Sequence, residues 1–221
     1  MSAPAGRTLW DIPTRVFHWG IVCCVPLAWW TAETQNYDIH EWVGYTVIVL
    51  VVTRIVWGFL GSRHSRFSDF VVGPGRALRY VRGGEPDSAG HNPLGGWSVM
   101  ALLLLLLAQA VSGLFNSDDI LFSGPLYYAA ETSFRDQMGV VHDVAFNILL
   151  GLVALHVLAI CYHQFRLREK LVQAMIKGSA PGREGRGEVA PAWRALVILV
   201  IVSLALWWGL EQAPQPAPLA W

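Results

Sequence analysis

The chain has little charge. Only 14% of its 221 residues are Asp, Glu, Lys or Arg, whereas a typical soluble domain carries about 25%. It also has no net charge, because 16 Lys and Arg balance 16 Asp and Glu. This composition argues against a simple soluble globule, and it excludes both a strongly basic nucleic-acid-binding protein and a polyacidic tail.

Cysteine is scarce as well, and it forms no metal-binding or disulfide motif. The three cysteines lie in apolar stretches without a CxxC pair, at Cys23, Cys24 and Cys161. Neither a thiolate zinc site nor a disulfide scaffold is therefore indicated. We expect buried free thiols at these positions.

Long apolar segments are what the chain does have, since 54% of its residues are hydrophobic. Five segments approach the length of about 20 residues that a helix needs to cross a bilayer. They are residues 16–32, 42–60, 97–115, 140–165 and 192–210. The first lacks the cleavage pattern of a signal peptide, so we interpret it as a retained helix. The sequence predicts an all-α integral membrane protein.

Basic residues fall in alternate loops between these segments. Of the 16 Lys and Arg, 14 lie before the first segment, between the second and third, or from the end of the fourth to the first residues of the fifth: Arg7, Arg15, Arg63, Arg66, Arg76, Arg79, Arg82, Arg166, Arg168, Lys170, Lys177, Arg183, Arg186 and Arg194. The other loops are acidic, with Arg135 as their only cation. Because cytoplasmic loops retain Lys and Arg, we expect a cytoplasmic N-terminus and a C-terminus outside.

Four of the seven histidines lie in or at the ends of apolar segments, where ionisable side chains are costly and mark functional candidates. From the expected helix directions, His40 and His142 lie near the outer surface, and His18 and His156 lie nearer the cytoplasm. His142 and His156 are 14 residues apart. This spacing places them on nearly one helix face, about 21 Å apart along the axis.

Paired imidazoles suit haem iron, which accepts two axial histidines, and helical bundles build such sites from facing helices. We therefore predict one haem between His40 and His142 and another between His18 and His156. Isolated polar contacts between helices remain an alternative, as does a histidine-lined metal transporter. A transporter path usually adds acidic or thiol partners, and here only Asp143 qualifies.

Arg54 is the only Lys or Arg deep inside an apolar segment, 14 residues after His40. A buried guanidinium needs an anionic partner, and a haem propionate at the inner level would supply one. Alternatively, the side chain snorkels to the cytoplasmic surface, which is about one and a half turns away. The sequence does not distinguish these two interpretations.

Several long runs resemble the bacterial cytochrome b561 family, which includes the b-type cytochrome subunit of nickel-iron hydrogenases. They are WDIPTRVFHW at 10–19, GYTVIVLVVTRIVWGFLGSRHSRFSDFVVGP at 44–74, GHNPLGGWSVMALLLL at 90–105, LLGLVALHVLAICYH at 149–163 and LVQAMIKG at 171–178. The resemblance implies a four-helix bundle in the bacterial inner membrane and electron exchange with the quinone pool. It also implies two b haems, with ligands at His18, His40, His142 and His156.

The resemblance covers about residues 8–178 and divides the chain. We expect a b-type cytochrome transmembrane domain at 1–178, followed at 179–221 by a cytoplasmic linker, a fifth transmembrane helix and a Pro-rich tail. The fifth helix has no histidine, so we expect it to pack on the bundle or dock a partner. We expect His163 at the surface. His91 precedes an expected helix start at Asn92 and Pro93 and suits a structural role.

These features predict a di-haem b-type cytochrome that transfers electrons across the inner membrane between a periplasmic redox partner and quinone. The partner is either a hydrogenase-like subunit, with the chain as the electron-transfer subunit of an oxidoreductase complex, or a c-type cytochrome served by a stand-alone quinol-linked protein. A haem-free transporter or structural membrane protein is an alternative of a different class. Membrane lipid surrounds the chain in each case. Homo- or hetero-oligomers are compatible with the sequence, and a nucleic-acid partner is not expected.

Overall fold

The computed structural model describes residues 8–84, 90–118, 120, 122–185 and 187–214, which are almost entirely helical. Five long helices dominate: α1 (Ile12–Glu33), α2 (Tyr37–Leu60), α5 (Pro93–Gly113), α6 (Thr132–Cys161) and α8 (Ala192–Glu211). The shorter elements are η1 (Arg63–Ser65), α3 (Phe67–Phe70), α4 (Pro74–Val81), η2 (Tyr127–Ala129), the π-helical η3 (Tyr162–Arg166) and α7 (Leu171–Lys177). All five predicted segments are helical, apart from the last two residues of the third.

Four helices are long and apolar enough to cross a membrane: α2, α5, α6 with its η3 extension, and α8. The sequence predicted five such spans, and the difference is α1. This helix has 22 residues, but polar side chains lower its hydropathy, among them Arg15, His18 and Glu33. It nevertheless packs lengthwise against α2.

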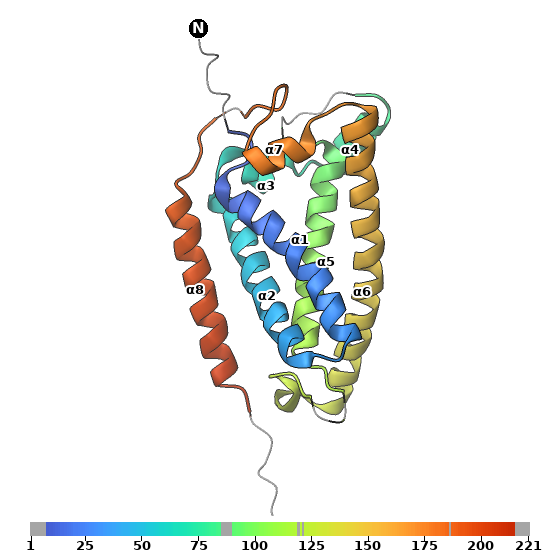
Figure 1. The fold of residues 1–221 in the computed structure, drawn as a ribbon, viewed down its shortest axis with the longest axis vertical. Helices are drawn as coiled ribbons and strands as arrows, with labels where there is room; N and C mark the ends of the chain where they lie inside the picture. The colour runs from blue at the N-terminus through green and yellow to red at the C-terminus, as the bar shows by residue number, and fades with distance from the viewer. Residues whose placement is uncertain (1–7, 85–89, 119, 121, 186, 215–221) are drawn as a thin grey trace, which may run out of the picture.

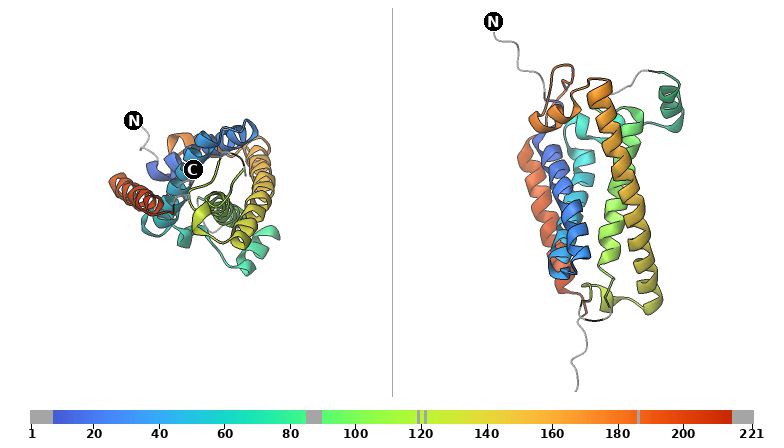
Figure 2. Two further views of the ribbon diagram at one scale, coloured as in Figure 1. Left: turned by 90° about the horizontal axis from the view of Figure 1, so that it is seen from below. Right: turned by 45° about the vertical axis from the view of Figure 1, so that its right-hand side comes forward.

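The long helices α1, α2, α5 and α6 form a bundle in which successive helices run in opposite directions (Figure 1). In this bundle α1 packs on α2, α2 packs on α5, and α5 packs on α6. The C-terminal α8 lies at the edge, where it contacts mainly α2 (Figures 1 and 2). Residues of α1, α2 and α6 that are far apart in the sequence therefore lie at similar levels along the axis of the bundle.

The alternating directions gather the connections at two ends (Figure 1). One end, called here the basic end, contains the start of α1, the segment from η1 to α4, and α7, with Arg63, Arg66, Arg79, Lys170 and Lys177. The other, the acidic end, contains the α1–α2 and α5–α6 connections, with Glu33, Asp38, Glu41, Asp118 and Glu131. Arg7, Arg186, Asp119 and the tail beyond residue 214 lie outside the described residues. The described basic residues are concentrated at the basic end as the sequence predicted, although acidic residues such as Asp11, Asp69 and Glu169 lie there too.

Capping side chains set where the helices begin. The carboxylate of Asp11 accepts a hydrogen bond from the Thr14 backbone N–H at 2.9 Å, and Asn92 accepts one from the Gly95 N–H at 2.7 Å. Asn92 is therefore the N-cap of α5, as predicted. Asn36 caps α2 in the same way. Because of this cap α2 begins at Tyr37, five residues earlier than predicted, so His40 lies inside its first turn.

The packed core is small for the length of the helices. It lies between α2, α3, α5 and α6 and consists of Val43, Val47, Val51, Phe67, Phe70, Leu103, Leu106 and Leu149. Many other large apolar side chains are exposed, particularly on α6 and α8, which is the pattern of helices whose outer faces contact lipid.

The cysteines follow the same pattern. Cys23 and Cys161 are exposed and Cys24 is half-buried, and all three are free thiols. The expectation of buried thiols was therefore wrong for two of the three. An apolar segment that faces lipid hides its side chains from water without burying them in protein.

Candidate functional site

The structure brings His40 and His142 together near the acidic end. His40 projects from the first turn of α2 and His142 from α6, and their ring centroids are 6.4 Å apart with the ring planes at 70°. The two histidines are 102 positions apart in the sequence, so only the packing of the bundle makes them neighbours.

Helix α5 holds the His142 ring on three sides. The ring Nδ1 donates to the Gln109 carbonyl oxygen at 2.9 Å, and the Ser112 hydroxyl lies 3.2 Å from the same nitrogen. A Cβ added at Gly113 would lie 3.0 Å from the ring Cε1, so only glycine leaves the ring this much room. The orientation of His142 is thus fixed by a neighbouring helix.

The ring nitrogens of both histidines suit a metal ligand. His40 Nδ1 donates to the Ala28 carbonyl at 2.9 Å, just as His142 Nδ1 donates to Gln109. Metal-binding histidines commonly use one nitrogen in this way, which leaves Nε2 for the metal. Two imidazoles that hold one metal each approach it to about 2 Å through a ring nitrogen, which requires neighbouring rings. The observed separation fits that arrangement.

A ligand bound to His142 at this site would displace the side chain of Gln109. Its amide Nε2 donates to His142 Nε2 at 2.9 Å, which is the nitrogen expected to bind a metal. Its Oε1 is buried and has no hydrogen-bond partner within the described part of the chain. A buried amide oxygen without a partner is costly, so a ligand that displaced this side chain would relieve that cost.

The second pair lies nearer the basic end. His18 of α1 and His156 of α6 are close enough to interact electrostatically. The His18 Nδ1 is buried without a hydrogen-bond partner among the residues that the structure describes. Along α6, an added Cβ at Gly151 would meet no atom within 4 Å, and the same holds for Gly44 on α2. Gly44 lies one turn after His40 and therefore borders open space beside the outer pair, whereas Gly151 is exposed on the outer surface of α6.

Arg54 lies inside the protein. Its side chain is 3% exposed, and its guanidinium carbon sits 5.3 Å from the centre of the Phe67 ring. The Nη1 atom is buried and has no hydrogen-bond partner in the described ranges. This burial does not fit a side chain that snorkels to the surface. An orphaned guanidinium nitrogen in the interior fits an anionic group such as a haem propionate.

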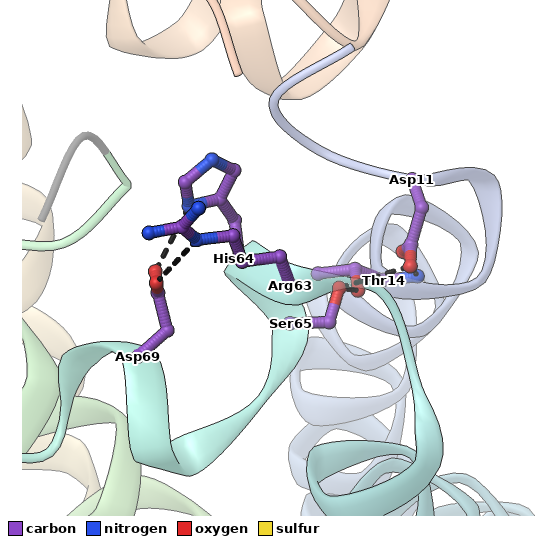
Figure 3. Close-up of polar contacts among 6 residues, drawn as sticks. All are labelled: Asp11, Thr14, Arg63, His64, Ser65 and Asp69. Atoms are coloured by element: carbon purple, nitrogen blue, oxygen red, sulfur yellow. Dashed lines mark hydrogen bonds and ion pairs between the residues drawn. The ribbon is translucent and has the colours of Figure 1, made fainter. Parts of the chain in front are cut away.

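A buried network at the basic end holds α1 to the end of α2 (Figure 3). The Asp11 carboxylate accepts hydrogen bonds from the Ser65 hydroxyl at 2.9 Å and the Trp57 indole at 3.0 Å, in addition to the Thr14 N–H. Burial alone would raise the pKa of Asp11, but hydrogen bonds, including one from Ser62, outweigh it and lower the pKa below its ordinary value. Asp11 therefore stays ionised and positions the start of α1, about two turns before His18.

The remaining histidines form local contacts at the basic end. His64 Nδ1 donates to an Asp69 oxygen at 2.9 Å, and Arg63 contacts the same carboxylate (Figure 3). His91 lies between the Trp10 and Phe70 rings, at centroid distances of 4.7 and 4.5 Å. Burial, together with the smaller effect of the nearby positive charge of Arg54, lowers the pKa of His91 to about 3. His64 and His91 therefore stabilise the connecting segments at the basic end.

His163 lies at the end of α6 and is partly exposed. Its Nδ1 is 3.3 Å from a Glu169 carboxylate oxygen, and 22% of its side chain is accessible. It is thus less exposed than the surface position predicted from the sequence, because the segment after η3 folds back over it.

The described residues contain no group of three or more His, Cys, Asp and Glu side chains that could hold a metal ion together. A pair of imidazoles is instead the number that completes the coordination of an iron held by a porphyrin. The residues present therefore fit haem. The outer pair offers imidazole nitrogens for the iron, and Arg54 offers a buried guanidinium nitrogen that has no hydrogen-bond partner among the described residues.

Sequence reasoning found the histidines but missed the groups that orient them. Gln109, Ser112 and Gly113 are ordinary helix residues in the sequence, and only their packing against α6 reveals their contact with His142. For Asp11 a local signal was present, because an acidic residue followed by Ile-Pro-Thr is typical of a helix start.

The chain matches a family model described as prokaryotic cytochrome b561 over residues 9–178. The matched region contains α1 to α7, with all four histidines and Arg54, while α8 lies beyond it. Searches of curated proteins and of solved structures find no match.

Proposed function

The chain belongs to the prokaryotic cytochrome b561 family and is therefore a bacterial membrane b-type cytochrome of electron transfer; from this premise we propose that it binds two b haems and carries electrons across the inner membrane. The contact between His40 and His142, at 6.4 Å between ring centroids, is the observation on which this proposal mainly rests. Their Nδ1 atoms are engaged by backbone carbonyls, and their Nε2 atoms are the proposed iron ligands.

The proposed inner ligands are His18 and His156. Because His156 follows His142 by 14 residues on α6, the two levels lie about 21 Å apart along that helix. The orphaned Nδ1 of His18 and the orphaned Nη1 of Arg54 both support an additional polar group at this level. Arg54 is the proposed partner of a propionate.

Bound haem supplies a one-electron iron couple. The protein contributes ligands, orientation and charge. With haem bound, His40 with His142, and His18 with His156, would each hold one iron through two imidazoles, which would suit electron transfer rather than oxygen activation. Ser112, Gly113 and the Gln109 carbonyl hold one of those ligands in place, so that it needs no reorientation during electron transfer.

We propose five transmembrane helices, with α1 added to the four candidates. An α-helix of 22 residues is about 33 Å long, which is sufficient for a hydrocarbon core of about 30 Å. Its packing along α2 supports the same interpretation. With the basic end in the cytoplasm, the N-terminus is cytoplasmic and the C-terminus periplasmic.

The proposed electron partners are quinone and a periplasmic redox protein. The outer histidine pair lies near the acidic end, which would suit a donor with a complementary basic patch. A hydrogenase-like subunit or a c-type cytochrome could provide it. In the first case the chain is the electron-transfer subunit of an oxidoreductase complex.

Haem quantification in the purified chain tests the proposal. We expect two haems for each chain and reducible Soret and alpha bands. The absence of those bands would favour a haem-free transporter or structural protein, and one haem for each chain would contradict the proposal of two sites. The His163→Ala variant serves as a control, because this histidine lies outside both pairs and should be dispensable for both haems.

A further inference from the structure

Helix α4 stands apart from the rest of the basic end. It projects sideways beyond the bundle, next to α5 and α6 (Figure 2). Its Ala77 is buried, but Leu78 and Val81 on the same side are 50% and 62% exposed. Protein atoms thus cover only part of its apolar face.

The opposite side of α4 is basic. At 100° for each residue, Arg76 and Arg79 point away from Leu78 and Val81. Arg82 follows at the C-terminal end, and all three arginines are exposed. An apolar face opposite a row of arginines is typical of helices that lie in the surface of a membrane.

The height of α4 fits such a position. The Trp97 indole N–H donates to the Val72 carbonyl at 2.8 Å, which ties the segment before α4 to the first turns of α5. Trp97 is 43% exposed and lies near the end of a candidate span. Exposed tryptophans at such ends mark the level where lipid meets water. Helix α4 therefore begins close to that level.

We propose that α4 lies in the cytoplasmic surface of the membrane and binds anionic phospholipid there. Leu78 and Val81 enter the acyl boundary, while Arg76, Arg79 and Arg82 contact the phosphate groups. Charge complementarity favours this occupant, because the helix and its C-cap residue together have three arginines and no acidic residue, and the cytoplasmic leaflet is negatively charged. The proposal rests on the membrane topology and is independent of haem binding.

Spin-label accessibility tests this placement in the full chain. Cysteines are introduced at Leu78 or Arg79 after replacing Cys23, Cys24 and Cys161 with alanine, and the protein is reconstituted into vesicles containing phosphatidylglycerol. We expect a label at position 78 to collide more with oxygen than with a water-soluble nickel chelate. A label at position 79 should show the reverse. Equal accessibility at the two positions would overturn the proposal.

A label at position 78 that is immobilised and reached by neither reagent would also overturn it, because α4 would then be covered by protein. Dipolar coupling between labels would identify a second copy as the cover.

Lipid charge is tested separately by counting the phosphatidylglycerol that co-purifies with otherwise unaltered protein. The variant R76Q/R79Q/R82Q should retain less of it, whereas R166Q/R168Q at the end of α6 should not. Equal retention in the two variants would contradict the role of the α4 arginines.

Discussion

At the scale of single residues, the proposed site depends on a few close contacts around His142. The ring has room only because residue 113 lacks a side chain, since a Cβ there would lie 3.0 Å from Cε1. The histidines themselves could be predicted from the sequence, because an ionisable residue in an apolar segment is conspicuous. The contacts of Gln109, Ser112 and Gly113 could not, because they depend on how α5 and α6 pack.

The variant Gly113→Ala tests this contact. We expect the added methyl group to displace the His142 ring and weaken binding of the outer haem by about 10- to 100-fold, as is typical when the groups around a metal ligand are disturbed. Haem retention during dilution measures the effect. In the control variant Gly209→Ala the new methyl group meets no atom within 4 Å, so haem binding should not change. Equal retention in both variants would contradict the proposed role of His142.

Arg54 belongs to the same scale. If its guanidinium contacts a propionate, Arg54→Leu removes a positive charge and should lower the midpoint potential of the inner haem, by about 60 mV for each 1.4 kcal/mol of lost interaction. The outer haem should be nearly unaffected. Arg54→Lys retains the charge and should shift the potential less. Superimposable titration curves for all three proteins would exclude the propionate contact.

His91 makes stability depend on pH. Its pKa falls from 6.5 to about 3 on folding, so the unfolded chain binds this proton more readily than the folded chain. The free energy of unfolding should therefore decrease as pH falls below 6.5, by up to about 1.4 kcal/mol for each pH unit. The variant His91→Phe keeps an aromatic ring beside Trp10 and Phe70 but cannot take up a proton.

Thermal unfolding in detergent, followed by circular dichroism between about pH 6.5 and pH 4, measures this dependence. We expect a shallower loss of stability in His91→Phe than in the unaltered protein. A slope that is the same in both would show that other groups control the acid response.

At the scale of elements, the long helices were the most predictable part. Their apolar runs are long enough to identify each helix, whereas their boundaries depend on caps such as Asn36. The short helices α3, α4 and α7 carry too few residues for a periodic signal. The low hydropathy of α1 as a candidate span was also hard to foresee, because it depends on a few polar residues such as Arg15, His18 and Glu33.

Helix α8 should be dispensable for haem binding. It contributes no histidine, contacts mainly α2, and has one buried residue, Ala195, along its described length. A chain that ends after Gly187 should therefore retain both haems if it inserts into the membrane. Membrane fractionation with haem quantification tests this expectation. Full-length and truncated chains should give the same haem-to-protein ratio, and an inserted but haem-free truncated chain would contradict it.

At the scale of the whole molecule, the zero net charge is a cancellation between two ends. The described basic residues gather where α1 begins and α2 and α6 end, whereas acidic residues outnumber basic ones at the other end. This separation predicted the direction of each helix, and the directions predicted which histidines share a level. For His40 and His142 the structure shows the neighbours that this reasoning implies.

A redox titration of single-histidine variants tests the central claim most directly. The unaltered protein should show two haems with separate midpoint potentials. His40→Ala and His142→Ala should each lose the same component and retain the other, while His18→Ala and His156→Ala should lose the remaining one. Loss of different components in His40→Ala and His142→Ala would contradict the pairing on which the account depends.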